Sequence, residues 1–546
     1  MGYALLWLEA LVAALLFVAT VAACAAQLQR RGMQLALWVV GALPPLLLFA
    51  TLSVGAGFLK YQGVLVDSLF YGLLALAICF TAGVIWIRLA GLRLLGEGLA
   101  RPVASGWSRG KLAVATVVAV ILCMMTYWNM DAVVGQQAAA LRAESGSLAL
   151  SVAPDRVPDR QNAAIIYGQA FETLGDYKTW PKKQREDWNK WTQFGSRQSN
   201  EKPEPFDPTD PALGKFLEDK ASVVALLHRA AALPGCYFDH EYGRPSFDML
   251  LPELSQLRSM ARLLALDARA KAARSDGAGA VADLNAIFAM AEHCSRAPLL
   301  ISLLVAIAID NLGTDSLEAV LAAGNLTAED LAALHVSDTI QYGRLFKRAL
   351  IMEEAFGLSV FHEMAGGLDT NAFALTGSDL SIPKGFGTLY GIFLLRDDVA
   401  SYRRFLKQYQ DMAAEPYYLR KNRWESSADL LKENRGIVTT LIAPALSSCA
   451  ETATRADARH RLARLGLAIS RYRAEHEDWP SELGALTPEY IIALPLDPFD
   501  GQPLRLKQTD SGPIVYSIGP DGQDDGAQTF DKKQKTGDLT LQLSGQ

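Results

Sequence analysis

Residues 4–26, ALLWLEALVAALLFVATVAACAA, decide the organisation of this chain. Three further apolar stretches follow at 34–59, 68–90 and 112–130, and no comparable stretch occurs in the rest of the sequence. Each has about the 20 residues that an α-helix needs to cross the hydrocarbon core of a bilayer. We therefore expect a mainly α protein in which residues 1–130 form a four-helix transmembrane anchor.

The character of these stretches favours an anchor over a signal peptide or a transporter. The first stretch has no basic residues before it and exceeds the apolar region of a typical secretory signal, so we expect it to be retained. Glu9 is the one acid within the four stretches. Transporters usually carry charged residues at mid-membrane depth and internal repeats, and this sequence shows neither pattern.

Basic residues in the short links predict the topology. Arg30 and Arg31 follow the first stretch, whereas the second link holds only Lys60 and Asp67. The third link carries one acid, Glu97, and five basic residues: Arg88, Arg93, Arg101, Arg109 and Lys111. Because Lys and Arg are retained on the cytoplasmic side, links one and three face the cytoplasm. The prediction is a multi-pass protein of the bacterial inner membrane with both termini in the periplasm.

Composition excludes some classes of function. With 546 residues, a net charge of −6 and a pI of about 5.8, the chain is long enough for several domains and has no basic excess that would favour nucleic acid. Its cysteines show no CxxC or Cys/His zinc spacing. Outside the anchor lie Cys236, Cys294 and Cys449, and a single disulfide among them stays open.

Residues 131–450 predict a periplasmic α-helical domain. The segment KFLEDKASVVALLHRAAAL is expected to form one helix, and LLISLLVAIAI, 299–309, a buried core helix too short to span a membrane. Three tryptophans before them are expected to cover the domain: Trp180, Trp188 and Trp191. Residues 261–291, ARLLALDARAKAARSDGAGAVADLNAIFAMA, resemble the helical hairpins of tetratricopeptide-type repeats. No clean 34-residue period is found, so we expect an irregular, solenoid-like α-hairpin stack.

Two later segments leave alternatives open. Ile382–Leu395 is apolar and interrupted by glycine, and it either packs in the core or lies against a membrane or partner. The basic residues Arg403, Arg404 and Lys407 form either a solvated helix face or a contact with acidic lipid headgroups.

Motifs of catalysis are not found in the sequence. His362-Glu363 begins a zinc-protease motif, but the second histidine one helical turn later is missing. There is no G-x-S-x-G elbow, phosphate-binding P-loop or dinucleotide fingerprint, and the seven histidines show no metal spacing. Acidic residues that come together only in the folded protein leave no such motif in the sequence.

Residues 451–546 predict a small α+β module. The helix 451–476 has an apolar stripe, and short apolar runs at 503–506, 513–517 and 538–543 predict a small antiparallel sheet on that helix. Three motifs follow the helix in order: Trp479-Pro480, then Asp497-Pro498-Phe499-Asp500-Gly501-Gln502-Pro503, then Tyr516-Ser517-Ile518-Gly519-Pro520-Asp521-Gly522. They resemble the globular domain of the type II secretion major pseudopilins over about 85 residues.

That resemblance implies a calcium-binding loop near the end of the chain. Asp521 matches the aspartate of the family's D-G motif, and Asp538 is the counterpart of its late aspartate. Asp524 and Asp525 are additional acids that complete the candidate calcium site. The loop departs from the family pattern because it is longer and contains three lysines: Lys532, Lys533 and Lys535. A solvated Asp/Gly turn without an ion is therefore the alternative.

The sequence favours one function and leaves two alternatives. A pilin-type N-terminal helix does not directly precede the tail, so a filament subunit is not expected. We expect a membrane-anchored periplasmic scaffold or accessory subunit of a larger bacterial envelope complex. It would contact the lipid bilayer and bind other membrane or periplasmic proteins through the helical domain and tail. The alternatives are an extracytoplasmic hydrolase, with a site between the helical and tail domains, and a transporter or channel component. The chain also resembles bacterial membrane proteins that pair a helical periplasmic domain with such a tail.

Overall fold

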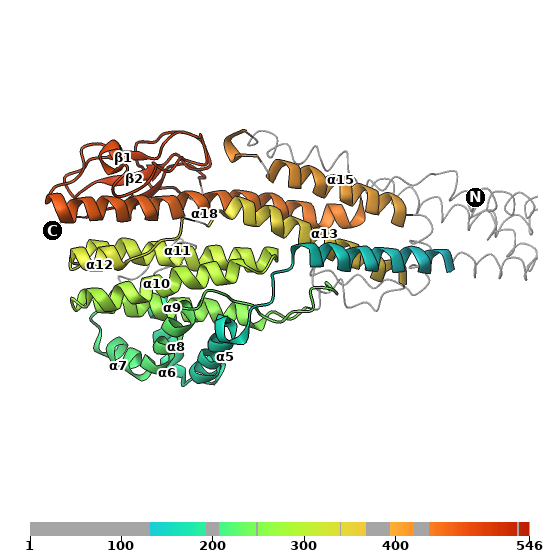
Figure 1. Cartoon of the computed structure of the whole chain (residues 1–546), viewed down its shortest axis with the longest axis horizontal. Coiled ribbons are helices and arrows are strands. Elements are labelled where there is room, and N and C mark those ends of the chain that lie inside the picture. The colour runs from blue at the N-terminus through green and yellow to red at the C-terminus, as the bar shows by residue number, and fades with distance from the viewer. Residues whose placement is uncertain are drawn as a thin grey trace, which may run out of the picture. The chain divides into compact units, whose positions relative to one another are not determined.

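The fold is mainly helical with one small antiparallel sheet (Figure 1). The computed structural model describes residues 132–192, 207–246, 249–338, 340–366, 394–413, 415–419, 436–531 and 534–544. The four apolar stretches predicted as an anchor and nearly all of the apolar segment predicted at 382–395 lie outside the described residues.

The chain divides into two compact units. The first comprises Met1–Ala140, Phe361–Tyr402 and Leu431–Thr440, and the second comprises the other three segments, Leu141–Val360, Arg403–Leu430 and Leu441–Gln546. In the first unit the rings of Phe361 and Tyr402 meet edge to face with centroids 5.4 Å apart. His362, the residue of the incomplete zinc motif, points Nδ1 at the carbonyl oxygen of Ala138, 2.9 Å away.

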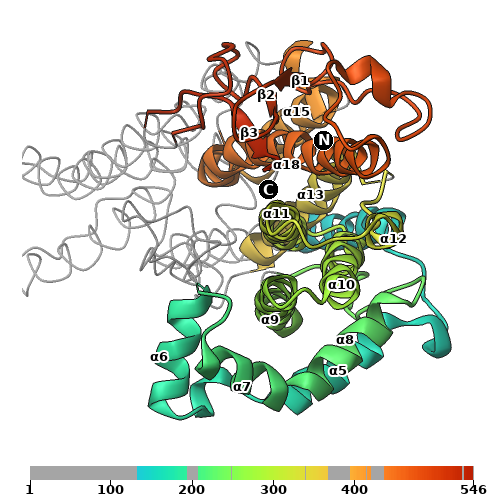
Figure 2. The ribbon, with the colours of Figure 1, turned by 90° about the vertical axis from the view of Figure 1, so that its left-hand side faces the viewer.

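Three long helices form the centre of the second unit. They are α9 (Pro252–Ala273), α10 (Gly277–Ser295) and α11 (Leu300–Ala322), and each contacts the other two (Figure 2). The chain reverses between α9 and α10 at Ser275, whose φ of 60° ends the first helix. Asp276 then caps α10 by accepting a hydrogen bond from the Gly279 N–H. Asp276 thus ends the turn between the two helices, and α10 begins at Gly277.

Helix α11 is one of the core helices. Among the described residues it alone is long and apolar enough to cross a membrane, and 61% of its apolar window is buried inside the protein. Its buried residues include Asp310, Thr314 and Ser316 as well as aliphatic side chains. The prediction of a buried helix at 299–309 is confirmed, although the helix is longer than that apolar run.

A smaller helical group packs beside α9 and α10. Its elements are η1 (Asp159–Gln161), α5 (Ala163–Leu174), η2 (Tyr177–Thr179), α6 (Lys182–Trp191), α7 (Pro211–Asp219) and α8 (Ala221–Ala231). The prediction of one continuous helix over 215–233 is wrong. At Lys220 the backbone ψ is near 7°, outside the usual helical range, so α7 ends and α8 begins there. The three predicted covering tryptophans, in contrast, are all buried.

The first turn of α13 (Tyr342–Gly366) is capped by Asp457, a residue far along the chain. The Asp457 carboxylate accepts hydrogen bonds from the Tyr342 and Gly343 N–H groups, at 2.6 and 3.2 Å. Before it, α12 (Ala328–Ala333) begins with a complete capping box that Thr327 forms with Asp330. A helix over 132–152, α15 (Leu395–Ala413) and the short helical segment 417–419 complete the described helical elements before the tail.

The tail combines a long helix with a three-stranded sheet. Helix α18 (Ile437–His476) starts 14 residues before the predicted 451, so the domain boundary expected at 450 falls inside a continuous helix. After η5 (Leu483–Leu486), the strands β1 (Arg505–Lys507), β2 (Ile514–Ser517) and β3 (Leu539–Gln542) form an antiparallel sheet in the order β1-β2-β3. Val515 pairs with Leu506 on one side and with Leu541 on the other.

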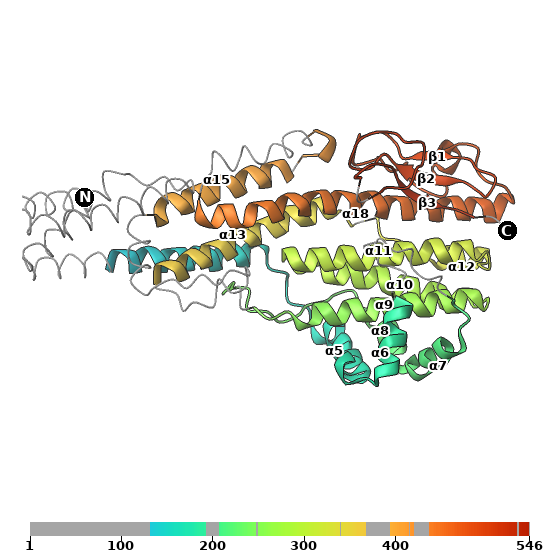
Figure 3. The same cartoon turned by 180° about the vertical axis from the view of Figure 1, so that it is seen from behind.

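Within the second unit, α18 belongs to two hydrophobic cores. On the side of the sheet, Leu465 and Ile469 pack with Val515 and Leu541. On the opposite side, Ala463 and Leu467 share a core with residues of α9, α10 and α11. Figure 3 shows α18 between the sheet and the helical layer, which is formed by α9, α10 and α11. The tail is therefore joined to the helical layer through the common helix α18.

Candidate functional site

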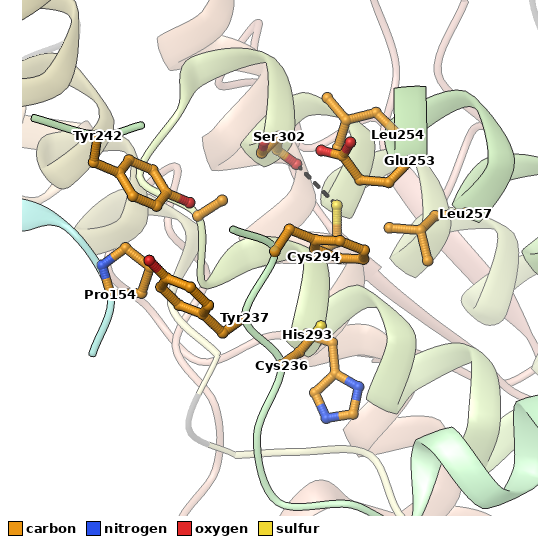
Figure 4. Close-up of a pocket in the computed structure, with 12 residues that line it drawn as sticks. Pro154, Cys236, Tyr237, Tyr242, Glu253, Leu254, Leu257, His293, Cys294 and Ser302 are labelled. Atoms are coloured by element: carbon orange, nitrogen blue, oxygen red, sulfur yellow. Dashed lines mark hydrogen bonds between the residues drawn. The ribbon is translucent and has the colours of Figure 1, made fainter. Parts of the chain in front are cut away.

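A small cavity lies where the loop before α9 meets α10 and α11 (Figure 4). It has room for about 10 Å³, the size of a single water molecule. Its polar lining comes from Cys236, Tyr237, Tyr242, Glu253, His293, Cys294 and Ser302. The loop is held in place by Asn162, whose side chain accepts from the Tyr237 N–H and donates to the Tyr237 carbonyl. The cavity is thus fixed, polar on several sides and too small for an organic substrate.

The histidine of the cavity has no free nitrogen. His293 Nε2 donates to the Leu233 carbonyl oxygen at 3.0 Å, so Nδ1 accepts from the Tyr167 hydroxyl, also at 3.0 Å. Burial, with a smaller effect of Arg296, lowers the pKa of His293 to about 4. The ring is therefore neutral and holds two chain segments together, which is a structural role.

The two cysteines of the cavity are free thiols. Burial raises the pKa of Cys236 to about 12 and raises that of Cys294 further. The Cys294 thiol donates to the Ser302 carbonyl oxygen at 3.4 Å. Because the thiolate is the reactive form, neither thiol is activated as a nucleophile at neutral pH. The disulfide that the sequence left open is not formed, and Cys449 is likewise free.

A second group of ionisable residues lies between α8, α9 and α10. The Lys271 ammonium is 2.8 Å from both Asp267 Oδ2 and Asp283 Oδ2. His228 Nε2 lies 2.7 Å from Asp283 Oδ1, so the buried Asp283 has two basic partners. Burial and the neighbouring Asp283 carboxylate raise the pKa of Asp267 to about 6.

This carboxylate pair is what a hydrolase would need for general acid and base catalysis. Its oxygens, however, already face Lys271 and His228 within the helical layer. The sequence did not single out these residues. The spacing of Asp267 and Lys271, four positions apart in one helix, is a signal for their ion pair. The approach of Asp283 and His228 depends on how three helices pack, and no local pattern encodes it.

The predicted calcium ligands are all in the loop before β3. Asp538 is fully buried, and its two carboxylate oxygens accept from the Asp525 and Ala527 N–H groups, at 3.4 and 2.6 Å. Asp521 accepts from the Gln523 and Gly537 N–H groups. The fold thus brings Asp521 close to the strand that begins after Asp538.

The other two predicted ligands differ in their surroundings. Asp524 accepts from the Gly526 N–H and lies 3.0 Å from the Arg505 Nε, whereas the Asp525 side chain is exposed. Among the described residues, no group of three or more His, Cys, Asp or Glu side chains is arranged to hold a metal ion. A bound calcium ion therefore stays a prediction.

The second and third motifs of the tail, 497–503 and 516–522, meet at one buried carboxylate. Asp497, fully buried, accepts from the Phe499 and Ile518 N–H groups and from the Ser517 hydroxyl, each at 2.9 Å. Residues 497–503 and 516–522 are thus tied together by one side chain. This explains physically why an aspartate and a serine stand at these two positions of the sequence.

The comparisons with known proteins return no relative. No protein-family model, curated protein or solved structure matches this chain. The resemblances to pseudopilins and to tetratricopeptide-type hairpins consequently stay predictions, supported only by their motifs and by the described elements.

Proposed function

We propose that this protein is a membrane-anchored periplasmic scaffold or accessory subunit of a larger bacterial envelope complex. In this proposal the four N-terminal apolar stretches are the anchor. The α-hairpin layer is an irregular solenoid-like body, and the tail is a pseudopilin-like module that binds a partner protein. The basic links of the first 130 residues support a periplasmic location for everything after them.

Four exposed apolar side chains of the tail region carry this proposal. Ile492 is 86% exposed and Leu496 is 49% exposed on the loop that leads into the 497–503 turn. Tyr418 and Leu419 are also exposed, on a segment that packs against the same turn. Side chains of this kind, when they gather on one region, are typical of surfaces that bind another protein.

Neighbouring contacts hold the backbone that carries part of this surface. The Tyr417 ring packs edge to face on Phe499 with centroids 5.3 Å apart, and Tyr418 lies against Gly501. Arg461 of α18 donates to the Leu496 carbonyl oxygen at 2.6 Å. A partner would therefore meet a preorganised surface, which lowers the entropic cost of binding.

The test is a pull-down of the full chain from detergent-solubilised membranes, with Ile492→Asp and Leu496→Asp as the disrupting variants. Leu250→Asp is the matched control because Leu250 is equally apolar and 83% exposed, but lies before α9. We expect a stoichiometric partner with the native protein and with the control, and loss of at least about tenfold in recovery with the double variant, corresponding to ~1.4 kcal/mol. Equal recovery with all three proteins would contradict the proposed surface.

A topology measurement tests the location separately. A reporter that is active only outside the cytoplasm, fused after residue 546, is expected to be active. A reporter fused in the third link, near Arg101, is expected to be inactive. The reverse pattern would remove the periplasmic scaffold from consideration, whatever the pull-down shows.

A further inference from the structure

Arg505 occupies the centre of the acidic region of the tail. Its Nη2 lies 2.5 Å from Asp500 Oδ2, its Nε 3.0 Å from Asp524 Oδ2 and its Nη1 3.4 Å from Asp497 Oδ2. The guanidinium therefore meets three carboxylates from two separate segments, the 497–503 turn and the loop after β2. Its side chain is 24% exposed, so these contacts are partly shielded from water.

The loop between β2 and β3 is closed by hydrogen bonds of the protein itself. Asp521 Oδ2 accepts from the Gly537 N–H at 2.9 Å and so joins the two ends of the loop. The Asp538 carboxylate accepts from the Asp525 and Ala527 N–H groups. Its own backbone N–H donates to the Gln528 carbonyl oxygen at 2.6 Å. Lys507 of β1 adds a contact of 2.6 Å to the Gly526 carbonyl oxygen.

These contacts occupy the groups that calcium would use. Ca²⁺ takes six to eight oxygen ligands, and its carboxylate ligands must direct their lone pairs at the ion. Here the oxygens of Asp521 and Asp538 point at N–H donors, and Asp524 faces a guanidinium. A fixed positive charge within 3.0 Å of Asp524 also disfavours a second cation at that carboxylate.

We propose that Arg505 takes the place of a metal ion in this module, and that the folded tail neither requires nor binds calcium. Arginine suits this role because its planar guanidinium is always charged and presents five donors at fixed angles. One side chain can thus bind carboxylates on three sides, as a spherical cation would. The calcium loop implied by the resemblance is then replaced by a covalently attached cation.

The experiment measures hydrogen exchange of the loop amides in the full chain in detergent, with calcium or with a chelator. About 10 mM calcium is enough, since even weak extracellular sites bind near 10⁻³ M. We expect exchange in 519–531 to differ by less than about twofold between the two conditions, and titration calorimetry with calcium to show no binding heat. Slowing of exchange by calcium of about tenfold or more would overturn the proposal.

Two variants separate Arg505 from its neighbours. Arg505→Gln is expected to speed exchange of the loop amides by about tenfold, because three carboxylates lose their cation. Lys507→Gln is the matched control on the same strand, and we expect a change below about threefold since Lys507 contacts the loop through one exposed carbonyl. Equal effects of the two variants would refute the role of Arg505.

A third variant covers the case in which Arg505→Gln does not fold. Arg505→Lys keeps the charge but not the planar guanidinium. We therefore expect a hydrogen-exchange rate of the loop amides between the rate in the native protein and the rate in a fully opened loop. Exchange in Arg505→Lys as slow as in the native protein would show that charge alone suffices and would contradict the three-sided guanidinium contact. The calcium measurement on the native protein does not depend on any variant.

Discussion

The His460 imidazole and the Asp310 carboxylate form a buried ion pair that joins α18 to α11, with Nδ1 and Oδ1 2.9 Å apart. On the other side of the ring, Nε2 lies 2.6 Å from the Ser337 carbonyl oxygen. Both ring nitrogens thus face acceptors, which requires an N–H on each and favours the imidazolium. The pair links the tail helix α18 to α11 of the helical layer.

The first prediction concerns how stability varies with pH at this pair. Burial alone lowers the pKa of His460, but the Asp310 carboxylate and the Ser337 carbonyl outweigh it, so the native pKa is raised. Arg464 opposes this shift, and the nearby Asp457 is itself a buried carboxyl. The stabilisation is complete below the unfolded value of about 6.5 and is lost as the pH rises through the raised native pKa.

Urea unfolding of the full chain at a series of pH values, with hydrogen exchange of the α18 amides as the local readout, measures this effect. Above pH ~6.5 we expect a loss of up to about 1.4 kcal/mol per pH unit, the limit for one proton. His460→Asn should remove that slope. His476→Asn, on the exposed end of the same helix, should keep it. A slope that persists in His460→Asn would assign the effect to another group.

The second prediction concerns close packing of α10 on α11. A Cβ placed on Gly313 would lie 2.9 Å from the Phe288 ring and 3.1 Å from Ile287 Cγ2. Gly313→Ala gains about 1 kcal/mol of helix propensity but overpacks a buried contact, which costs about 1–3 kcal/mol. We expect a net loss of about 1 kcal/mol.

Gly168 provides the control for this substitution, because a Cβ there would meet no atom within 4 Å. Gly168→Ala in α5 is expected to stabilise by about 0.5–1 kcal/mol. Urea unfolding of both variants tests the pair, and the same sign for both would show that the α10–α11 contact relaxes without cost.

The third prediction concerns the charge group of α8, α9 and α10. Asp283→Asn leaves Lys271 and His228 without their shared carboxylate in a buried position, and we expect a loss of about 3 kcal/mol. Glu292→Gln removes an exposed pair with Arg296 on the same helix and should change stability by less than about 0.5 kcal/mol. Equal losses in urea unfolding would mean that the buried group contributes no more than a surface pair.

Local patterns predicted many of the helical elements and the sheet. The buried helix at 299–309 and the three strands follow from residue types over a few positions, and such signals are short-range. The break at Lys220 was missed because the apolar pattern continues across it, with Leu217 on one side and Val223 on the other both buried. Helical spacing alone does not distinguish a bent junction from a continuous helix.

The candidate sites were predicted less completely, because they depend on contacts between distant segments. Asp457 caps a helix that begins 115 residues earlier, and His460 pairs with a residue 150 positions away. No pattern in the sequence indicated that Arg505 would lie among three carboxylates. Pairing across strands and loops is decided by the register of the sheet, which is set by the whole module.

The last prediction concerns Asp497, which holds the motifs 497–503 and 516–522 together. In Asp497→Asn one acceptor oxygen becomes an NH₂ group facing either the Ile518 N–H or the Phe499 N–H, so a buried donor loses its partner. We expect a loss of about 2–3 kcal/mol, read as faster exchange of the β2 amides and a lower urea midpoint. Asp510→Asn, on an exposed turn between β1 and β2, should stay within about 0.5 kcal/mol of the native protein. If the two variants unfold at the same urea concentration, the carboxylate of Asp497 does not organise the turn, and the link between the two motifs has to come from the packing of Phe499 with Ile518 instead.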